Sequence, residues 1–277
     1  MMPDFAPAYP LISANWLIQV LDHPNVAIAD CRFSLADPSA GRQQYQAGHI
    51  PGAFYFDLNQ DLSSPVQRHG GRHPLPDPDQ LAAKLAAAGV HFGETWVVAY
   101  DDSRFAFASR FWWLLRYLGH NRVVVLDGGF SGWLAAGYPT TPAIPKPRSG
   151  HFTPQVQPGQ VVDREGVIAC RDNPQVVLVD AREPERYRGE REPIDPIAGH
   201  IPGAVNYPWQ EVTDVQGKAL PVPQQQQRWE AIAPTSEIIV YCGSGVTACV
   251  NLLSLELAGR TGAKLYPGSW SDWCSYL

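Results

Sequence analysis

One cysteine, Cys242, stands at the start of a short loop of small residues, directly after a β-branched run. The run Ile238–Val240 predicts a buried strand, and the apolar spacing over Val250–Leu257 predicts a helix. Between them the chain reads Gly243-Ser-Gly-Val-Thr247. The sequence therefore predicts a strand–loop–helix unit with a thiol where the loop begins.

Such a loop suits a thiolate, the form in which cysteine acts as a nucleophile; a free thiol has a pKa of about 8.5. Gly243 and Gly245 allow the backbone to curl with its N–H groups inward, as an anion-binding nest. The helix that follows directs its positive dipole end at the loop, and Ser244 and Thr247 add hydroxyl donors. The same groups, with Val246 between them, would stabilise a persulfide, R–S–S⁻, on Cys242. This chemistry needs neither a metal nor an organic cofactor.

The chain also contains an internal repeat. The segment Ala198–Ala204 has the same sequence as Ala47–Ala53, and their histidines, His49 and His200, lie 151 positions apart. Strand-like runs alternate with helix-like runs in the same order in both halves. A repeat of this length predicts tandem domains rather than a solenoid. The expected fold class is α/β, with a mainly parallel sheet flanked by helices in each domain.

The expected boundaries follow from a proline-rich stretch. Residues 1–140 form the first domain, residues 141–154 a stiff linker without periodicity, and residues 155–277 the second domain. The position of Cys242 is occupied by Asp101 in the first domain. A residue needed only for the fold would recur in both halves, so the comparison favours a chemical role for Cys242. The alternative for Cys242 is a buried structural cysteine at the end of a strand. Cys249, about two helical turns further on, is expected to be a buried helix residue.

The sequence from Cys242 to Ala248, with the duplicated His-Ile-Pro-Gly-Ala motif, resembles the two-domain sulfurtransferases, the family of rhodanese and 3-mercaptopyruvate sulfurtransferase. The resemblance runs from about Leu11 to Trp273. It implies two rhodanese-like domains, the first non-catalytic and the second carrying the catalytic cysteine. It also implies covalent transfer of a sulfane sulfur, from a small anionic donor to cyanide or a thiol such as thioredoxin, through a Cys242 persulfide.

The donor is indicated by the charge of the loop. Rhodaneses proper tend to carry Arg and Lys after the cysteine, which suits the dianion thiosulfate, whereas this chain has Gly243 and Ser244. The neutral loop therefore resembles the mercaptopyruvate branch, in which the loop serine assists at the substrate carbonyl. Thiosulfate is the alternative donor, and a non-catalytic rhodanese-like binding module is a weaker alternative for the whole chain.

Substrate-binding residues are carried over from the family one by one. Arg186 matches the arginine that holds the donor. The second arginine of the mercaptopyruvate branch falls in the segment Glu192–Asp195, which has none, so Arg188 or Arg191 would have to compensate. That branch also uses an Asp and a His of the first domain. The Asp position falls on Asn59, with Asp57 and Asp61 beside it, and the histidine is His73 or His69.

Composition and spacing exclude other classes. The net charge of −6 without a run of Lys and Arg argues against nucleic acid, and no apolar run approaches the roughly 20 residues that span a bilayer. Five scattered cysteines fit neither a disulfide framework nor a zinc site. With no signal-like N-terminus in Met1–Pro7, they indicate a reducing cytoplasm. Cysteine phosphatases of related fold need an arginine where this chain has Ala248.

Overall fold

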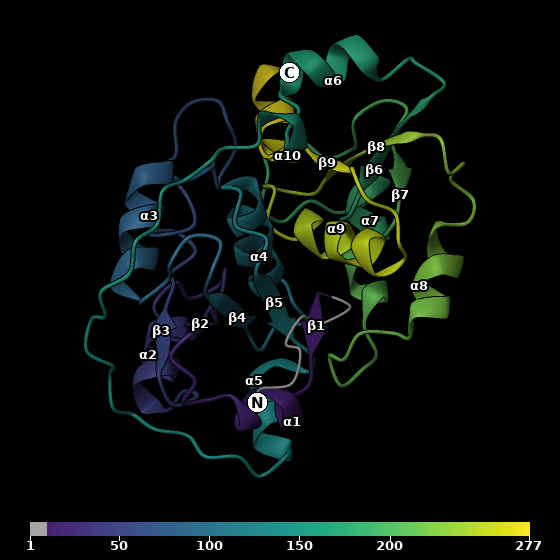
Figure 1. The fold of residues 1–277 in the computed structure, drawn as a ribbon. Helices are drawn as coiled ribbons and strands as arrows, with labels where there is room; N and C mark the ends of the chain where they lie inside the picture. Colours follow the sequence, from purple (N-terminus) through teal and green to yellow (C-terminus); the bar gives the residue numbers. More distant parts are fainter. Residues whose placement is uncertain (1–9) are drawn as a thin grey trace.

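The computed structural model describes residues 10–277, so the expectation for Met1–Pro7 lies outside the described residues. The chain forms two parallel sheets, each flanked by helices, which confirms the expected fold class (Figure 1). The strand order is β1-β5-β4-β2-β3 in the first sheet and β7-β6-β8-β9 in the second. Val161 bridges β9 in the second domain as β1 pairs with β5 in the first. The two halves therefore repeat one topology.

The elements of the first domain are β1 Leu11–Ile12, α1 Ala14–Gln19, β2 Val26–Asp30, α2 Ala40–Ala47, β3 Ala53–Tyr55, α3 Pro78–Ala87, β4 Trp96–Tyr100, α4 Ala108–Tyr117, β5 Val123–Leu126 and α5 Gly129–Ala135. Those of the second are α6 Arg164–Cys170, β6 Val176–Asp180, α7 Pro184–Tyr187, β7 Val205–Asn206, α8 Val222–Trp229, β8 Glu237–Tyr241, α9 Ala248–Leu257, β9 Lys264–Leu265 and α10 Ser269–Trp273. Three short 3₁₀ helices complete the fold: Pro158–Gln160, Trp209–Val212 and Cys274–Tyr276.

Helix α9 explains how the domains are joined. Nine of its ten residues are buried, so it is apolar on almost every side rather than along one stripe. One side packs on β8 and β9 of its own sheet, and another packs on α4 of the first domain; Figure 1 shows α4 and α9 side by side at the centre of the molecule. A single hydrophobic cluster accordingly contains core residues of both domains. The loop before α9 is thereby held against the first domain.

Residues 141–154 run along the outside of the first domain (Figure 1). Their backbone is tied to it, because Arg148 N donates to Ala87 O at 2.8 Å and Phe92 N donates to His151 O at 2.8 Å. Further on, Gln155 N donates to Leu118 O at 2.9 Å. The boundaries at 140 and 155 stay a prediction, but the stretch between them is a fixed strap along the first domain.

A buried ion pair lies at the end of β2 in the first sheet and at the end of β6 in the second. Arg32 pairs with Asp30, and Arg182 pairs with Asp180, each at 2.6 Å. Each arginine also donates to a glycine carbonyl of the repeated Gly-His-Ile-Pro-Gly turn, Gly48 O at 2.8 Å and Gly199 O at 2.7 Å. The repeated motif is thus a structural anchor beside the strand ends, where the functional loop begins.

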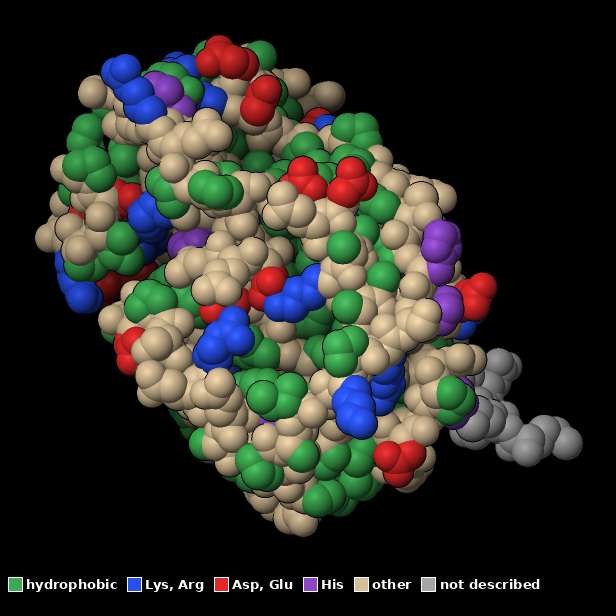
Figure 2. All heavy atoms as spheres, turned by 90° about the vertical axis from the view of Figure 1, so that its left-hand side faces the viewer, with side chains coloured by type: hydrophobic (Ala, Val, Ile, Leu, Met, Phe, Trp, Pro, Cys, Tyr) green, Lys and Arg blue, Asp and Glu red, His purple; other side chains and the backbone are tan. Residues whose placement is uncertain are grey.

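On the face drawn in Figure 2, basic and acidic side chains are interspersed, and neither sign forms a continuous patch. Of the helices formed by residues 10–277, none combines the length and the apolar character that crossing a bilayer requires.

Candidate active site

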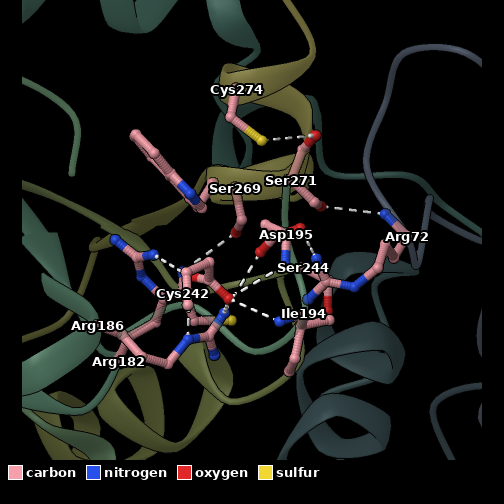
Figure 3. Close-up of polar contacts among 12 residues, drawn as sticks. Arg72, Arg182, Arg186, Ile194, Asp195, Cys242, Ser244, Ser269, Ser271 and Cys274 are labelled. Carbon is pink, nitrogen blue, oxygen red and sulfur yellow. Dashed lines mark hydrogen bonds and ion pairs between the residues drawn. The ribbon is translucent and has the colours of Figure 1, made fainter. Parts of the chain in front are cut away.

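Cys242 lies directly after β8, and its residue is only 1% exposed. Its backbone is held by the start of α10: Cys242 N donates to Ser269 Oγ at 3.1 Å, and Trp270 N donates to Cys242 O at 3.0 Å. Ser271 N donates to Gly243 O at 2.9 Å in the same way. Figure 3 shows Ser269 above Cys242 and the arginines around it. The thiol is therefore fixed by main-chain contacts from a neighbouring element.

The two glycines of the loop have different roles. Gly245 has a φ of +76°, and a Cβ there would lie 2.3 Å from Pro267 O, so the turn requires glycine. Gly243 does not adopt a left-handed conformation. A Cβ on Gly243 would instead lie 3.0 Å from Arg72 Nη2 and 3.4 Å from Arg186 Nη2. The expectation that both glycines curl the backbone is thus correct for Gly245, whereas Gly243 leaves room for two guanidinium groups.

The backbone N–H groups of the loop after Cys242 have no hydrogen-bond acceptor among the described residues. Within residues 10–277, none of the backbone N–H groups of residues 243–248 donates to a protein oxygen or nitrogen. Thr247, the residue before α9, makes no side-chain cap, so the helix also begins with free N–H groups. Buried N–H groups normally find an acceptor. The loop that follows Cys242 therefore has the capacity to bind an anion.

The first domain supports this interpretation, because the N–H groups of its equivalent loop do have an acceptor. The carboxylate of Asp101 accepts hydrogen bonds from four backbone N–H groups at 2.8 to 3.2 Å, those of Ser103, Phe105, Phe107 and Ala108. Burial raises the pKa of Asp101, while these N–H groups act to lower it. The same loop framework thus surrounds a carboxyl group in the first domain and a thiol in the second.

A histidine from the first domain reaches the loop. His73 Nδ1 lies 2.8 Å from Ser244 Oγ, and both residues are buried. Burial, followed by the nearby guanidinium groups of Arg110 and Arg72, lowers the pKa of His73 from 6.5 to about 4. His73 is therefore neutral at physiological pH. The other candidate, His69, bonds to Ser275 instead and lies outside the loop.

The acidic residues near Asn59 do not join this histidine. Asp57 accepts hydrogen bonds from Asn59 N and Gln60 N at 2.9 and 3.1 Å, and so caps its own turn. Asp61 pairs with Lys84. Neither carboxylate is hydrogen bonded to His73 in the described structure. Asp57 therefore caps its own turn and makes no hydrogen bond to His73 within residues 10–277.

Two arginines, one from each domain, flank the thiol loop. Arg186 Nη2 pairs with Glu192 Oε1 at 2.8 Å and with Asp195 Oδ2 at 3.3 Å. Arg72 pairs with the other oxygen of Asp195 and adjoins Gly243 (Figure 3). Arg188 pairs with Glu190 at the surface and does not supply the second cation. A second guanidinium group beside the loop comes from Arg72, which Asp195 holds there.

Cys249 is a buried helix residue, as expected. Its Sγ donates to Gly245 O at 3.5 Å, and burial raises the pKa of this thiol to about 12. Cys249 is therefore protonated at neutral pH and is no competitor for the nucleophile's role.

A pocket of about 270 Å³ opens onto Cys242 between the two domains. Its charged side chains include Arg72, Arg182, Glu183 and Arg186, and its loop residues are Gly243, Ser244, Val246 and Thr247. The apolar lining is Phe33, Leu35, Phe107, Ile194 and Trp209. Within residues 10–277 no group of three or more His, Cys, Asp or Glu side chains could hold a metal ion. The arrangement is a cysteine thiol facing a small cavity with cationic and apolar walls.

A fold of two rhodanese-like units and a loop thiol define a class of protein, and comparison with known proteins agrees. The family described as rhodanese-like domain matches residues 13–136 and 165–276. The chain is 47% identical to a probable 3-mercaptopyruvate sulfurtransferase of Pseudomonas aeruginosa, covering 95% of this chain and 94% of the relative. It is 38% identical to a putative thiosulfate sulfurtransferase of Mycobacterium tuberculosis, covering 90% of this chain and 88% of the relative.

A solved structure of a 3-mercaptopyruvate sulfurtransferase from Escherichia coli is also similar, at 32% identity and a TM-score of 0.82. It covers 95% of this chain and all of that one. The chain belongs to the two-domain rhodanese-like sulfurtransferases.

Ser269 provides a first test of how the thiol is held. It has a φ of +55°, whereas its counterpart in the first domain is Gly129, with a φ of +56°. Ser269→Gly removes the acceptor for Cys242 N but suits the left-handed backbone. We expect turnover to fall about tenfold, with the free energy of unfolding changing by less than about 1 kcal/mol. Steady-state kinetics and urea unfolding check both values; unchanged turnover would show that the contact does not position the thiol.

The low pKa of His73 provides a second test. The unfolded chain takes up this proton near pH 6.5 and the folded chain only near pH 4. The stability associated with neutral His73 is thus complete above about pH 6.5 and is lost as the pH falls toward 4, by up to about 3 kcal/mol. In His73→Gln, we expect the loss of stability between pH 7 and pH 4.5, measured by urea unfolding, to be smaller by about 2 kcal/mol. An equal loss in both proteins would contradict a buried neutral histidine.

Proposed function

We propose that this enzyme transfers a sulfane sulfur from 3-mercaptopyruvate to a thiol or cyanide through a persulfide on Cys242. The observation that carries the proposal is the set of unpaired loop N–H groups around Cys242, together with the carboxylate that fills the same loop in the first domain. A thiolate and a persulfide are the anions that this chain itself can place there.

The first half-reaction forms the persulfide. The Cys242 thiolate attacks the sulfur of mercaptopyruvate, the C–S bond breaks, and its electron pair moves onto the substrate as the enolate of pyruvate. The enolate takes up the thiol proton and leaves as pyruvate, with R–S–S⁻ remaining on Cys242. Ser244 Oγ, held by His73, stabilises the negative charge that develops at the carbonyl oxygen. Because His73 is neutral, it orients this hydroxyl without adding a charge.

The second half-reaction consumes the persulfide. An acceptor thiolate or cyanide attacks the outer sulfur, the S–S bond breaks, and its electron pair returns to Cys242 as the thiolate. The cycle is balanced without a redox cofactor and implies ping-pong kinetics. Gly243, Ser244, Gly245, Val246 and Thr247 cradle the anion in both states.

The preference for mercaptopyruvate follows from the charges beside the loop. Arg72 and Arg186 supply two positive charges, and Asp195 and Glu192, which bind them, supply two negative charges. This cluster is neutral as a whole, so it favours a monoanionic carboxylate over a dianion. Each guanidinium group still adjoins Gly243 and can donate to the donor's carboxylate.

Thiosulfate is the second candidate donor. The same two guanidinium groups could bind its oxygens, and one similar relative carries the name putative thiosulfate sulfurtransferase. Its two negative charges make its binding more sensitive to Asp195 than that of mercaptopyruvate.

The acceptor that we propose is a thiol, with thioredoxin as the macromolecular case. The pocket that contains Cys242 is lined at Leu35 and Ile194 by apolar side chains that are themselves exposed, which suits contact with another protein. All five cysteines are free, which supports a reducing compartment and hence the cytoplasm.

Substitution of the two loop-region cysteines tests the persulfide mechanism. We expect Cys242→Ser to lower kcat by at least about a thousandfold, as loss of a nucleophile does. Cys249→Ser is the matched control, because a serine hydroxyl can donate to Gly245 O in place of the thiol. It should keep most of the activity in a cyanide or thiol acceptor assay. Transfer activity in Cys242→Ser close to that of the wild type would rule out the mechanism.

Asp195→Asn tests the donor assignment. In the wild type, kcat/KM should be higher for 3-mercaptopyruvate than for thiosulfate with the same acceptor. Removing one negative charge favours the dianion more, so the ratio should shift toward thiosulfate by about three- to tenfold. Glu190→Gln, which removes an exposed carboxylate that pairs with Arg188, is the control and should leave the ratio unchanged. A wild-type enzyme that prefers thiosulfate by a wide margin would overturn the assignment.

A further inference from the structure

Arg110, on α4 of the first domain, is completely buried next to the thiol loop. Its Nη1 donates to Gly245 O at 3.1 Å, and its Nη2 donates to His73 O at 3.3 Å and Leu62 O at 3.5 Å. One guanidinium group therefore contacts the loop that cradles Cys242 and the backbone of the histidine that holds Ser244. These two segments come from different domains.

The charge of this guanidinium group has no carboxylate to balance it. Arg110 forms no ion pair with an Asp or Glu in the described structure, and its Nε is buried without a hydrogen-bond partner. Arginine stays protonated in proteins. A buried, unpaired cation is costly, so an anion is expected close by.

Two thiols belong to the segment that Arg110 contacts: Cys242 at the start of the loop and Cys249 at the start of α9. Burial lowers the pKa of Arg110, and the neighbouring thiols of Cys249 and Cys242 act against this shift. Burial, however, raises the pKa of Cys249 to about 12, so that thiol is neutral. The remaining thiol is that of Cys242, which begins the loop whose Gly245 O accepts from Arg110 Nη1.

Other charged groups also face Cys242. Those around the loop and pocket are Arg72, His73, Arg182, Glu183, Arg186, Glu192 and Asp195. His73 is neutral. Arg72 and Arg186 are bound to Asp195, and Arg182 is bound to Asp180 and Glu192. Arg110 is thus distinguished from these arginines by having no carboxylate partner.

We propose that Arg110 is the buried counter-charge of the Cys242 thiolate and persulfide, and that it positions the Gly245 carbonyl and His73 for catalysis. It acts through the loop and through its electric field and does not touch the donor. The non-catalytic domain would then supply the cation that the catalytic loop, Gly243–Thr247, lacks in its own sequence. This proposal rests on the function proposed for Cys242.

The test compares Arg110→Lys with Arg110→Gln, which are both shorter than arginine and both able to donate, but differ in charge. The readout is the pH dependence of iodoacetamide alkylation at Cys242, followed by mass spectrometry of its peptide, which requires no turnover. We expect Arg110→Gln to raise the apparent pKa of the thiol by about one unit or more and to slow alkylation at pH 7 about tenfold. Arg110→Lys should stay within about threefold of the wild type.

Two controls separate charge from structure. Arg104→Gln removes another arginine that crosses between the domains; it donates to Thr213 Oγ1 and Gln210 O and does not line the thiol pocket. Cys249→Ser removes the other thiol near Arg110. Neither should move the alkylation profile. In Arg110→Gln, kcat/KM for the donor should fall at pH 7 and recover in part at higher pH.

Coincident profiles for Arg110→Gln and Arg110→Lys, or an Arg110→Gln profile equal to that of the wild type, would overturn the proposal. If Arg110→Gln alkylates normally but Cys242→Ser is inactive, only the role of Arg110 fails. If Cys242→Ser is fully active, the function proposed for the thiol fails with it.

Discussion

The site depends on the need of the loop N–H groups for an anion. A strand that ends in a tight loop and a helix leaves several backbone N–H groups pointing at one place, where leaving them unpaired costs free energy. The first domain meets this need with the carboxylate of Asp101, which is permanently attached and unreactive. The second domain has Cys242 at the same place, so the scaffold favours the thiolate or persulfide. The duplication separates the structural requirement from the chemical one.

The remaining features of the site come from the contact between the domains. The packing of α4 on α9 holds the loop against His73, Arg72 and Arg110 of the first domain. The first domain thus loses the thiol but supplies the neutral histidine, one of the two guanidinium groups beside Gly243 and the buried cation. In this sense the loop thiol of the second domain and its partners from the first domain form one site.

The sequence was sufficient for the local features. Cys242, its loop, the strand and helix on either side and the duplicated α/β fold were all predictable, because each depends on residues close together in the chain or on the visible repeat. Arg186 was carried over from the family's motif, and the structure places it beside Gly243. For the histidine, the sequence left two candidates, His73 and His69. The structure separates them, because His73 bonds to Ser244 whereas His69 packs against Ser275 and Tyr276.

Long-range partners could not be predicted in this way. Arg72 and Asp195 are 123 residues apart in sequence, and Arg110 and Gly245 are 135 apart. No periodicity or spacing in one sequence links such pairs; they are set by how the domains dock. The segment Glu192–Asp195 contains no arginine, but its Asp195 pairs with Arg72 of the first domain beside the loop. At Gly243, the reason for a glycine is likewise the space that Arg72 and Arg186 occupy, and not the conformation of its backbone.

The most direct test of the account is the mass of the protein after treatment with 3-mercaptopyruvate in the absence of an acceptor. The account predicts one added sulfur atom per chain, located on the peptide that contains Cys242 and removed by cyanide. The same treatment should leave Cys31, Cys170, Cys249 and Cys274 unmodified. Sulfur on one of those cysteines instead, with Cys242 unmodified, would contradict it.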